Sequence, residues 1–265
     1  MLLTRILTAI AGIPLIFACV YFGDLPFFIM MFIVSFFCVQ EYLSIVKQYK
    51  PHAAASLILA SAFFIFLCFF KEFPADKSAV CAIAMLFIFF VLEVFWGNPQ
   101  LSVERISASF LGSFFLPLAF AHMVYLRQMT SGREIIFFLF LTVWILDTAA
   151  YAFGRMFGRH KLAPNVSPKK TIEGAAAGIV FGLLTAVICK YAFMDSVFTL
   201  PQILLLGLII STVGQFSDLA ESLVKRDGNI KDSGKIIPGH GGVFDRFDSY
   251  IFAAPAVYYF LLFIK

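Results

Sequence analysis

The sequence predicts an all-α, polytopic integral membrane helix bundle with about nine transmembrane helices, and three observations support this prediction. Hydrophobic residues make up 61% of the 265-residue chain. Charged residues make up only 14%, against about 25% in a typical soluble protein. Apolar runs of roughly 20 residues, the length that crosses a bilayer, follow one another along the chain. Little sequence is left for a soluble domain, so any chemistry must take place on short loops and helix ends.

Turn signals and charged segments separate the apolar runs. The first run lacks a small-residue cleavage site, so it is interpreted as a retained span and not as a removed signal peptide. The motif G-D-L-P follows the first run, a basic segment with Lys47 and Lys50 follows the second, K-E-F-P-A-D-K follows the third, and G-N-P follows the fourth. The predicted spans are, in order, residues 6–22, 27–46, 54–70, 79–95, 106–126, 134–153, a seventh that starts near 172, 201–226 and 249–264.

The seventh span opens with Gly174, Gly178 and Gly182, a spacing that lets two helix backbones approach closely. This ladder is interpreted as purely structural. The chain is predicted to divide into N-terminal scaffold helices, residues 1–130, and C-terminal helices with catalytic loops, residues 131–265.

Charge and cysteine usage exclude several classes of function. The net charge is only +4, so anionic lipid or a polyphosphate is a better partner than nucleic acid. The five cysteines lie singly in apolar runs, which supports neither a disulfide framework nor a zinc site. With nine spans, 13 of the 20 lysines and arginines fall on one side, which the positive-inside rule assigns to the cytoplasm.

The densest polar stretch runs from residue 215 to residue 248. It holds six carboxylates and five basic side chains, interleaved with five glycines, in a largely apolar chain. Charge is expensive near a bilayer, so this density indicates function. Gln215, Asp218, Ser222 and Lys225 share one face if the segment is helical, and Asp245 and Asp248 share one face if the chain forms helix there again.

These residue types suit polyphosphate chemistry. A nucleoside triphosphate carries Mg²⁺, which binds carboxylates, water and phosphate oxygens, and Asp218, Asp245 and Asp248 offer such oxygens. Positive side chains stabilise the negative charge that develops in phosphoryl transfer. The side chains predicted to provide this charge are Lys225, Arg226, Lys231 and Arg246.

A second basic segment, residues 155–174, precedes the seventh span. Ser167 is predicted to cap a helix with Pro168 at its first position, which would place Lys169 and Lys170 at a helix N-terminus that attracts anions. The segment is interpreted as a phosphate pocket, and simple anchoring to anionic lipid remains the alternative.

Several isolated polar residues leave their roles open. Asp147 lies within the sixth span, either as a paired structural group or as a residue that faces the site. His240 is a poor metal ligand among glycines, and contact with phosphate or loop packing suits it better. Glu41, Glu93, His52 and His122 are interpreted as polar residues of helix ends or of the bundle interior.

The stretch S-L-V-K-R-D-G-N-I-K-D-S-G-K-I-I-P-G-H-G-G-V-F-D-R-F-D resembles the C-terminal signature of the phosphatidate cytidylyltransferase (CDP-diacylglycerol synthase) family. The segments D-T-A-A-Y and S-P-K-K-T-I-E-G resemble it too. Many members have glycine where this chain has Ser217. The resemblance implies a membrane enzyme that joins CTP to phosphatidic acid, with Mg²⁺ held by Asp218 and Asp245 and a second cation such as K⁺ beside it.

The resemblance also implies a homodimer, and the expected location is a bacterial plasma (inner) membrane with the site facing the cytoplasm. The site requires Asp218 and Asp245 to share one ion. Two alternatives are a CDP-alcohol phosphotransferase, whose D-x-x-D-G-x-x-A-R motif does not occur here, and a lipid transporter. The candidate catalytic residues are Ser222, Lys225, Arg226, Lys231, Asp232, His240, Arg246 and Asp248, and the candidate substrate-binding residues are Ser167, Lys169, Lys170, Gly241 and Gly242.

Overall fold

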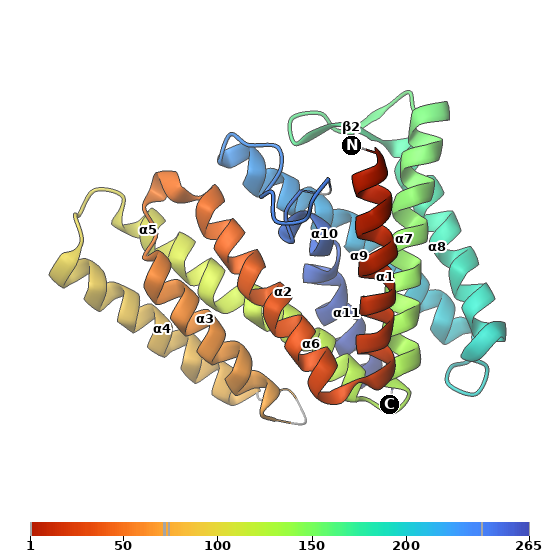
Figure 1. The fold of residues 1–265 in the computed structure, drawn as a ribbon, viewed down its shortest axis with the longest axis horizontal. Helices are drawn as coiled ribbons and strands as arrows, with labels where there is room; N and C mark the ends of the chain where they lie inside the picture. Colours follow the sequence, from red (N-terminus) through yellow and green to blue (C-terminus); the bar gives the residue numbers. More distant parts are fainter. Residues whose placement is uncertain (1, 71–72, 74, 240, 265) are drawn as a thin grey trace. The chain divides into compact units, whose positions relative to one another are not determined.

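The structure is a computed structural model that describes residues 2–70, 73, 75–239 and 241–264 (Figure 1). In this described part, six helical segments are long and apolar enough to cross a membrane, which confirms the predicted all-α membrane helix bundle. The predicted number of about nine spans stays a prediction. The six segments are Asp24–Ile45, Ala75–Trp96, Ser102–Gln128, Gly132–Phe157, Ile172–Phe193 and Leu200–Asp227.

The chain forms two compact units, and the first consists of Met1–Gln128 and Val224–Phe247. The segment 224–247, from the C-terminal half of the sequence, therefore packs with the N-terminal helices. The elements of this unit are α1 (Leu2–Phe22), α2 (Asp24–Ile45), η1 (Lys47–Tyr49), α3 (Ala53–Cys68), α4 (Ala75–Trp96), α5 (Ser102–Phe110), η2 (Leu111–Phe115), α6 (Leu116–Gln128) and α10 (Phe244–Phe247).

Helices α2, α3 and α6 form the core of the first unit. Phe27, Phe64 and Phe120 are almost completely buried there, and Phe120 makes an edge contact with Phe247 of α10. Large aromatic side chains bury much apolar surface, so the contact between Phe120 and Phe247 stabilises the packing of α10 against α6. A second set of contacts fixes the end of α9, because Gln48 and Tyr49 both donate hydrogen bonds to the Asp227 carboxylate.

The second unit consists of Met129–Leu223 and Asp248–Lys265. Helix α9 belongs mainly to this unit, and its last turn belongs to the first unit. The elements are α7 (Gly132–Phe157), β1 (Lys161–Ala163), β2 (Ser167–Thr171), α8 (Ile172–Phe193), α9 (Leu200–Asp227) and α11 (Tyr250–Phe263).

The glycine ladder of α8 makes the close helix contacts that its spacing predicts. A Cβ added to Gly174 would lie 2.6 Å from the backbone oxygen of Ala150 in α7. A Cβ on Gly182 would overlap the Ser211 hydroxyl of α9. The absence of side chains on this face therefore lets α8 pack against both neighbouring helices.

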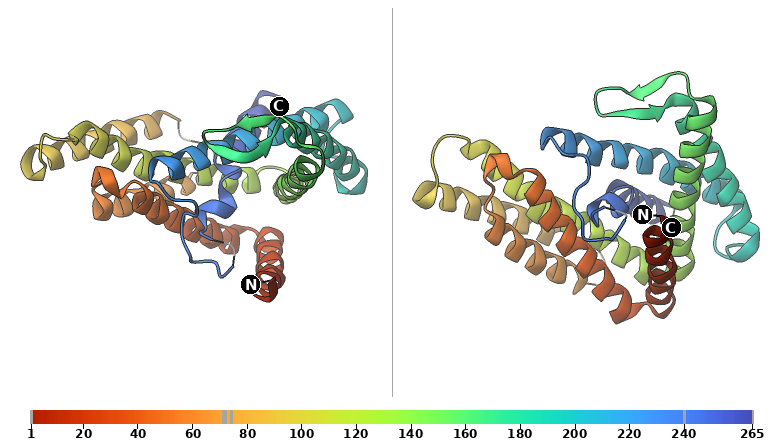
Figure 2. Two further views of the ribbon diagram at one scale, coloured as in Figure 1. Left: turned by 90° about the horizontal axis from the view of Figure 1, so that it is seen from above. Right: turned by 45° about the horizontal axis from the view of Figure 1, so that its top comes forward.

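The predicted helix cap at Ser167 is wrong. Ser167 begins β2, which pairs antiparallel with β1, and α8 begins only at Ile172. The two strands form the green hairpin in Figure 2. Thr171 is the N-cap instead, and its hydroxyl accepts a hydrogen bond from the backbone N–H of Gly174 at 3.1 Å. A threonine three residues before a free N–H satisfies that donor, so it sets the start of the helix. Lys169 and Lys170 consequently lie in the hairpin and not in a helix.

Candidate active site

A cavity of about 530 Å³ lies in the second unit, with basic and acidic side chains in its wall. One wall comes from α7, where Asp147, Tyr151 and Arg155 follow at intervals of four residues and so share one helix face. The other polar residues come from the hairpin and from α9. They are Lys161, Lys169, Lys170, Thr171, Gln215 and Asp218.

An ion pair joins the two polar stretches that the sequence singled out. The Lys170 ammonium lies 2.6 Å from the Asp218 carboxylate, and both side chains are a little over one quarter exposed. The hairpin is held in place at its base, where the backbone N–H of His160 donates to the Glu173 carboxylate and that of Ile172 donates to the His160 carbonyl. The antiparallel pairing thus places Lys170 of β2 beside Asp218 of α9.

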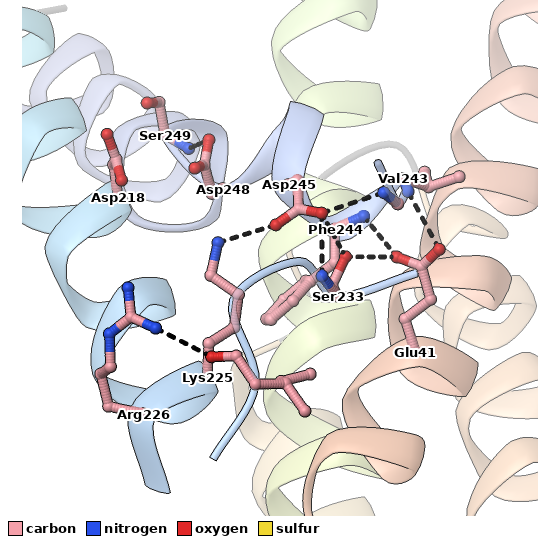
Figure 3. A network of polar contacts seen from close by, with 12 residues as sticks. Glu41, Asp218, Lys225, Arg226, Ser233, Val243, Phe244, Asp245, Asp248 and Ser249 are labelled. Carbon is pink, nitrogen blue, oxygen red and sulfur yellow. Dashed lines mark hydrogen bonds and ion pairs between the residues drawn. The ribbon is translucent and has the colours of Figure 1, made fainter. Parts of the chain in front are cut away.

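Three carboxylates gather beside this ion pair. One oxygen from each of Asp218, Glu221 and Asp248 lies within 4.8 Å of the other two. Figure 3 shows two of the three, Asp218 and Asp248, next to each other. Burial raises the pKa of the Asp248 carboxyl well above its ordinary value, and the negative charges of Asp218, Glu221 and Asp147 raise it further. Carboxylates this close repel one another unless a cation or a proton intervenes. Oxygen donors of this kind are the ligands that Mg²⁺ and Ca²⁺ prefer, so the cluster fits a divalent cation.

Asp245 has a different environment in the first unit. Its Oδ1 accepts a hydrogen bond from the Lys225 ammonium at 2.7 Å, and its Oδ2 accepts from the backbone N–H groups of Ser233 and Gly242 at 2.9 Å each. Burial raises the pKa of Asp245, but Lys225 and these N–H donors outweigh that effect and lower it below its ordinary value. Asp245 is therefore held as an ionised carboxylate.

Comparison with known proteins places the chain in a family. The model of the cytidylyltransferase family matches residues 3–264. The chain belongs to this family. It is 33% identical over 267 residues to a protein named phosphatidate cytidylyltransferase from Bacillus subtilis (strain 168), with 97% of this chain and 96% of the relative covered. Proteins of the same name from Staphylococcus saprophyticus and Synechocystis sp. are 34% and 32% identical, each with at least 95% of both chains covered.

The structure of this cytidylyltransferase brings some of the candidate residues together. Lys169, Lys170 and Asp218 line the cavity, and Asp248 joins Asp218 in the carboxylate cluster. Ser222 is buried in α9 one position after Glu221. Asp218 and Asp245 belong to different compact units, so their sharing one ion stays a prediction.

The remaining described candidates lie in the first unit. Arg226 donates to the Ile230 carbonyl at 2.9 Å and so satisfies a backbone group just beyond α9. Lys231, Asp232 and Arg246 are exposed. Gly241 and Gly242 lie next to Asp245, where a Cβ on Gly241 would crowd its carboxylate. His240 lies outside the described residues. Asp245 lies in the short helix α10, which ends at Phe247, so Asp248 follows directly after its last residue.

Sequence reasoning passed over three residues that the structure places in these clusters. Glu221 joins the carboxylate cluster, Ser233 binds Asp245, and Glu41 binds the segment around Ser233. A signal existed for Glu41, since a carboxylate in an otherwise apolar helix indicates a specific partner. For Asp147, whose role the sequence left open, the structure supports the site-facing alternative, because Asp147 lines the cavity with Asp218.

Proposed function

We propose that this chain is a phosphatidate cytidylyltransferase. It transfers the cytidylyl group of CTP to phosphatidic acid and releases CDP-diacylglycerol and pyrophosphate. The observation that carries the proposal is the cavity whose wall holds four basic side chains, Arg155, Lys161, Lys169 and Lys170, together with the carboxylates of Asp147 and Asp218. Full-length similarity to proteins of that name supports it.

The reaction needs positioning and charge stabilisation more than a nucleophilic side chain. A phosphate monoester carries a charge of about −1.5 to −2 near neutral pH, so an oxygen of phosphatidate already serves as the nucleophile. It forms a bond to the α-phosphorus of CTP, and the bond from that phosphorus to the bridging oxygen of the β-phosphate breaks. The lysines and arginine of the cavity bring the two anions together and stabilise the charge on the leaving pyrophosphate.

A divalent cation, for which we propose Mg²⁺, fits the carboxylate cluster. Asp218, Glu221 and Asp248 would hold it, and bound there it neutralises charge on phosphate oxygens. Asp245 and a second cation such as K⁺ stay predicted parts of the same site. Lys170 is proposed to bind a substrate phosphate, which would compete with Asp218 for its ammonium group.

Location and assembly follow from the same proposal. The relatives are bacterial proteins, and the basic loops favour a cytoplasmic site under the positive-inside rule. We therefore propose an inner-membrane protein with about nine spans, a cytoplasmic active site and a homodimeric assembly. The substitution Lys169→Cys tests the orientation of the active site. In intact cells a membrane-impermeant maleimide should not react with this cysteine until the cells are opened.

Transfer of label tests the activity directly. Purified protein in detergent, given CTP labelled at the α-phosphate and phosphatidic acid, should produce labelled lipid and an equal amount of pyrophosphate. A CDP-alcohol phosphotransferase would instead consume CDP-diacylglycerol with an alcohol, and a transporter would leave both substrates unchanged. Unlabelled lipid after incubation with Mg²⁺ would refute the proposal.

A further inference from the structure

Glu41 is a buried carboxylate near the end of the mostly apolar helix α2, and it is only 4% exposed. Its hydrogen-bond partners come from a segment about 200 residues away in the sequence. Its Oε1 accepts from the backbone N–H of Val243 at 3.1 Å, and its Oε2 accepts from that of Phe244 at 2.8 Å. The same Oε2 lies 2.9 Å from the Ser233 hydroxyl (Figure 3).

The Ser233 hydroxyl connects Glu41 to Asp245. Its oxygen lies 2.9 Å from an oxygen of each carboxylate. A serine hydroxyl has a single proton to donate, so this proton is shared between two carboxylates that would otherwise repel each other. The Lys225 ammonium completes the chain of contacts on the far side of Asp245. The order of contacts is Glu41, Ser233, Asp245, Lys225.

Two glycines give the Glu41 carboxylate the space it occupies. A Cβ on Gly234 or on Gly242 would overlap the carboxylate oxygens of Glu41. Ser233–Gly234 and Gly242–Phe244 thus pack closely around this one side chain. Burying a carboxylate is unfavourable unless hydrogen bonds compensate it, and the three donors Ser233, Val243 and Phe244 provide that compensation.

We infer that Glu41 is a positioning residue for cytidylyl transfer. It does not reach the substrate itself. It fixes Ser233, Val243 and Phe244 against α2, and through Ser233 it fixes the orientation of Asp245 and Lys225. This inference rests on the proposed function, and it assigns the N-terminal helices a part in the active site beyond that of a scaffold.

The substitution Glu41→Gln tests the inference with little change in volume. Glutamine has one acceptor oxygen where glutamate has two, and its NH₂ group must face a donor that Glu41 now accepts from. Ser233, Val243 and Phe244 should therefore be held less firmly while the helices stay packed. We expect kcat to fall by about 10- to 100-fold at saturating CTP and phosphatidate, because small displacements of positioned groups have effects of this size.

A matched control separates positioning from general stability. Glu93 is also a buried carboxylate of the first unit, and it pairs with His52 and Arg105 at 2.6 and 2.7 Å instead of binding the donors of Glu41. Glu93→Gln should lower the melting temperature and leave kcat of the folded fraction close to that of the unmodified protein. Ser233→Ala, which keeps Glu41 but removes the shared hydroxyl, should lower kcat and combine non-additively with Glu41→Gln.

Hydrogen exchange gives a readout that does not depend on activity. In Glu41→Gln, the backbone amides of Ser233, Gly242, Val243 and Phe244 should exchange faster, whereas those of α3 and α6 should keep their protection. An unchanged kcat, or an equal loss of kcat in Glu93→Gln, would overturn the positioning role. Lack of turnover by the unmodified protein would instead count against the proposed function, and the exchange data would still decide whether Glu41 orders the residues that donate to it.

Discussion

Asp218 takes part in one attractive and one repulsive electrostatic interaction. It forms an ion pair with Lys170, and it lies beside Glu221 and Asp248 in a cluster of like charge. A bound cation relieves the repulsion in the cluster, and ligand binding to the folded state alone raises stability by about 2.7 kcal/mol at 100 times the Kd.

Mg²⁺ is accordingly predicted to raise the melting temperature of the purified protein without substrate. Asp218→Asn should remove most of this increase and all measurable transfer. Asp195→Asn is a suitable control, since Asp195 pairs with Lys190 and takes no part in the cluster. A Mg²⁺-dependent increase that persists in Asp218→Asn would exclude Asp218 as a ligand.

Ser217 is the residue at which the chain departs from the family signature it resembles. Its hydroxyl donates to the Asp248 carbonyl and accepts from the backbone N–H of Phe252 at 3.2 Å, and the side chain is buried. Ser217→Ala should cost about 1 kcal/mol of stability, the usual value of such a hydrogen bond. In this variant the transfer rate should also depend less strongly on the Mg²⁺ concentration, because the Asp248 carbonyl loses its hydrogen bond from Ser217. Thermal unfolding and a Mg²⁺ titration of the transfer rate measure the two effects.

At the scale of elements, the contact of α7 with α8 determines the shape of the cavity. Both helices line it, and a Cβ on Gly174 of α8 would lie only 2.6 Å from the Ala150 oxygen of α7. Gly174→Ala would place a methyl group against the Ala150 carbonyl, and overpacking of this kind costs about 1–3 kcal/mol.

The melting temperature of Gly174→Ala should therefore fall, and the KM for CTP should rise as the walls of the cavity separate. Gly12→Ala makes the same chemical change in α1, where no atom lies within 4 Å of the added methyl group. That variant should be neutral or slightly more stable, because alanine favours a helix. Equal melting temperatures for the two variants would contradict the proposed close approach.

At the scale of the whole molecule, the chain does not divide at one point. Residues 224–247 return to the N-terminal helices, and residues 248–265 belong again with α7, α8 and α9. A fragment of residues 1–130 would lack Ser233, Val243 and Phe244, which donate hydrogen bonds to Glu41. An unpaired buried carboxylate is strongly destabilising.

Residues 1–130 expressed alone should thus be far more sensitive to protease than when co-expressed with residues 131–265. Glu41→Leu in the fragment should recover part of the resistance, since it removes the unpaired charge. If the fragment alone resists protease as well as the co-expressed pair does, the hydrogen bonds to Glu41 contribute little to the stability of the first unit.

The sequence by itself determined the membrane helix bundle, the positions of its long apolar helices, and the two polar segments that hold the candidate site. Hydropathy and helical spacing are local properties, so they can be read along one stretch of chain. Only the tertiary structure decided that Lys170 reaches Asp218 from a hairpin, that Asp248 joins Asp218 and Glu221, and that Glu41 binds the residues around Ser233. Such pairings join residues far apart in the chain, and the choice among possible partners depends on how the helices pack.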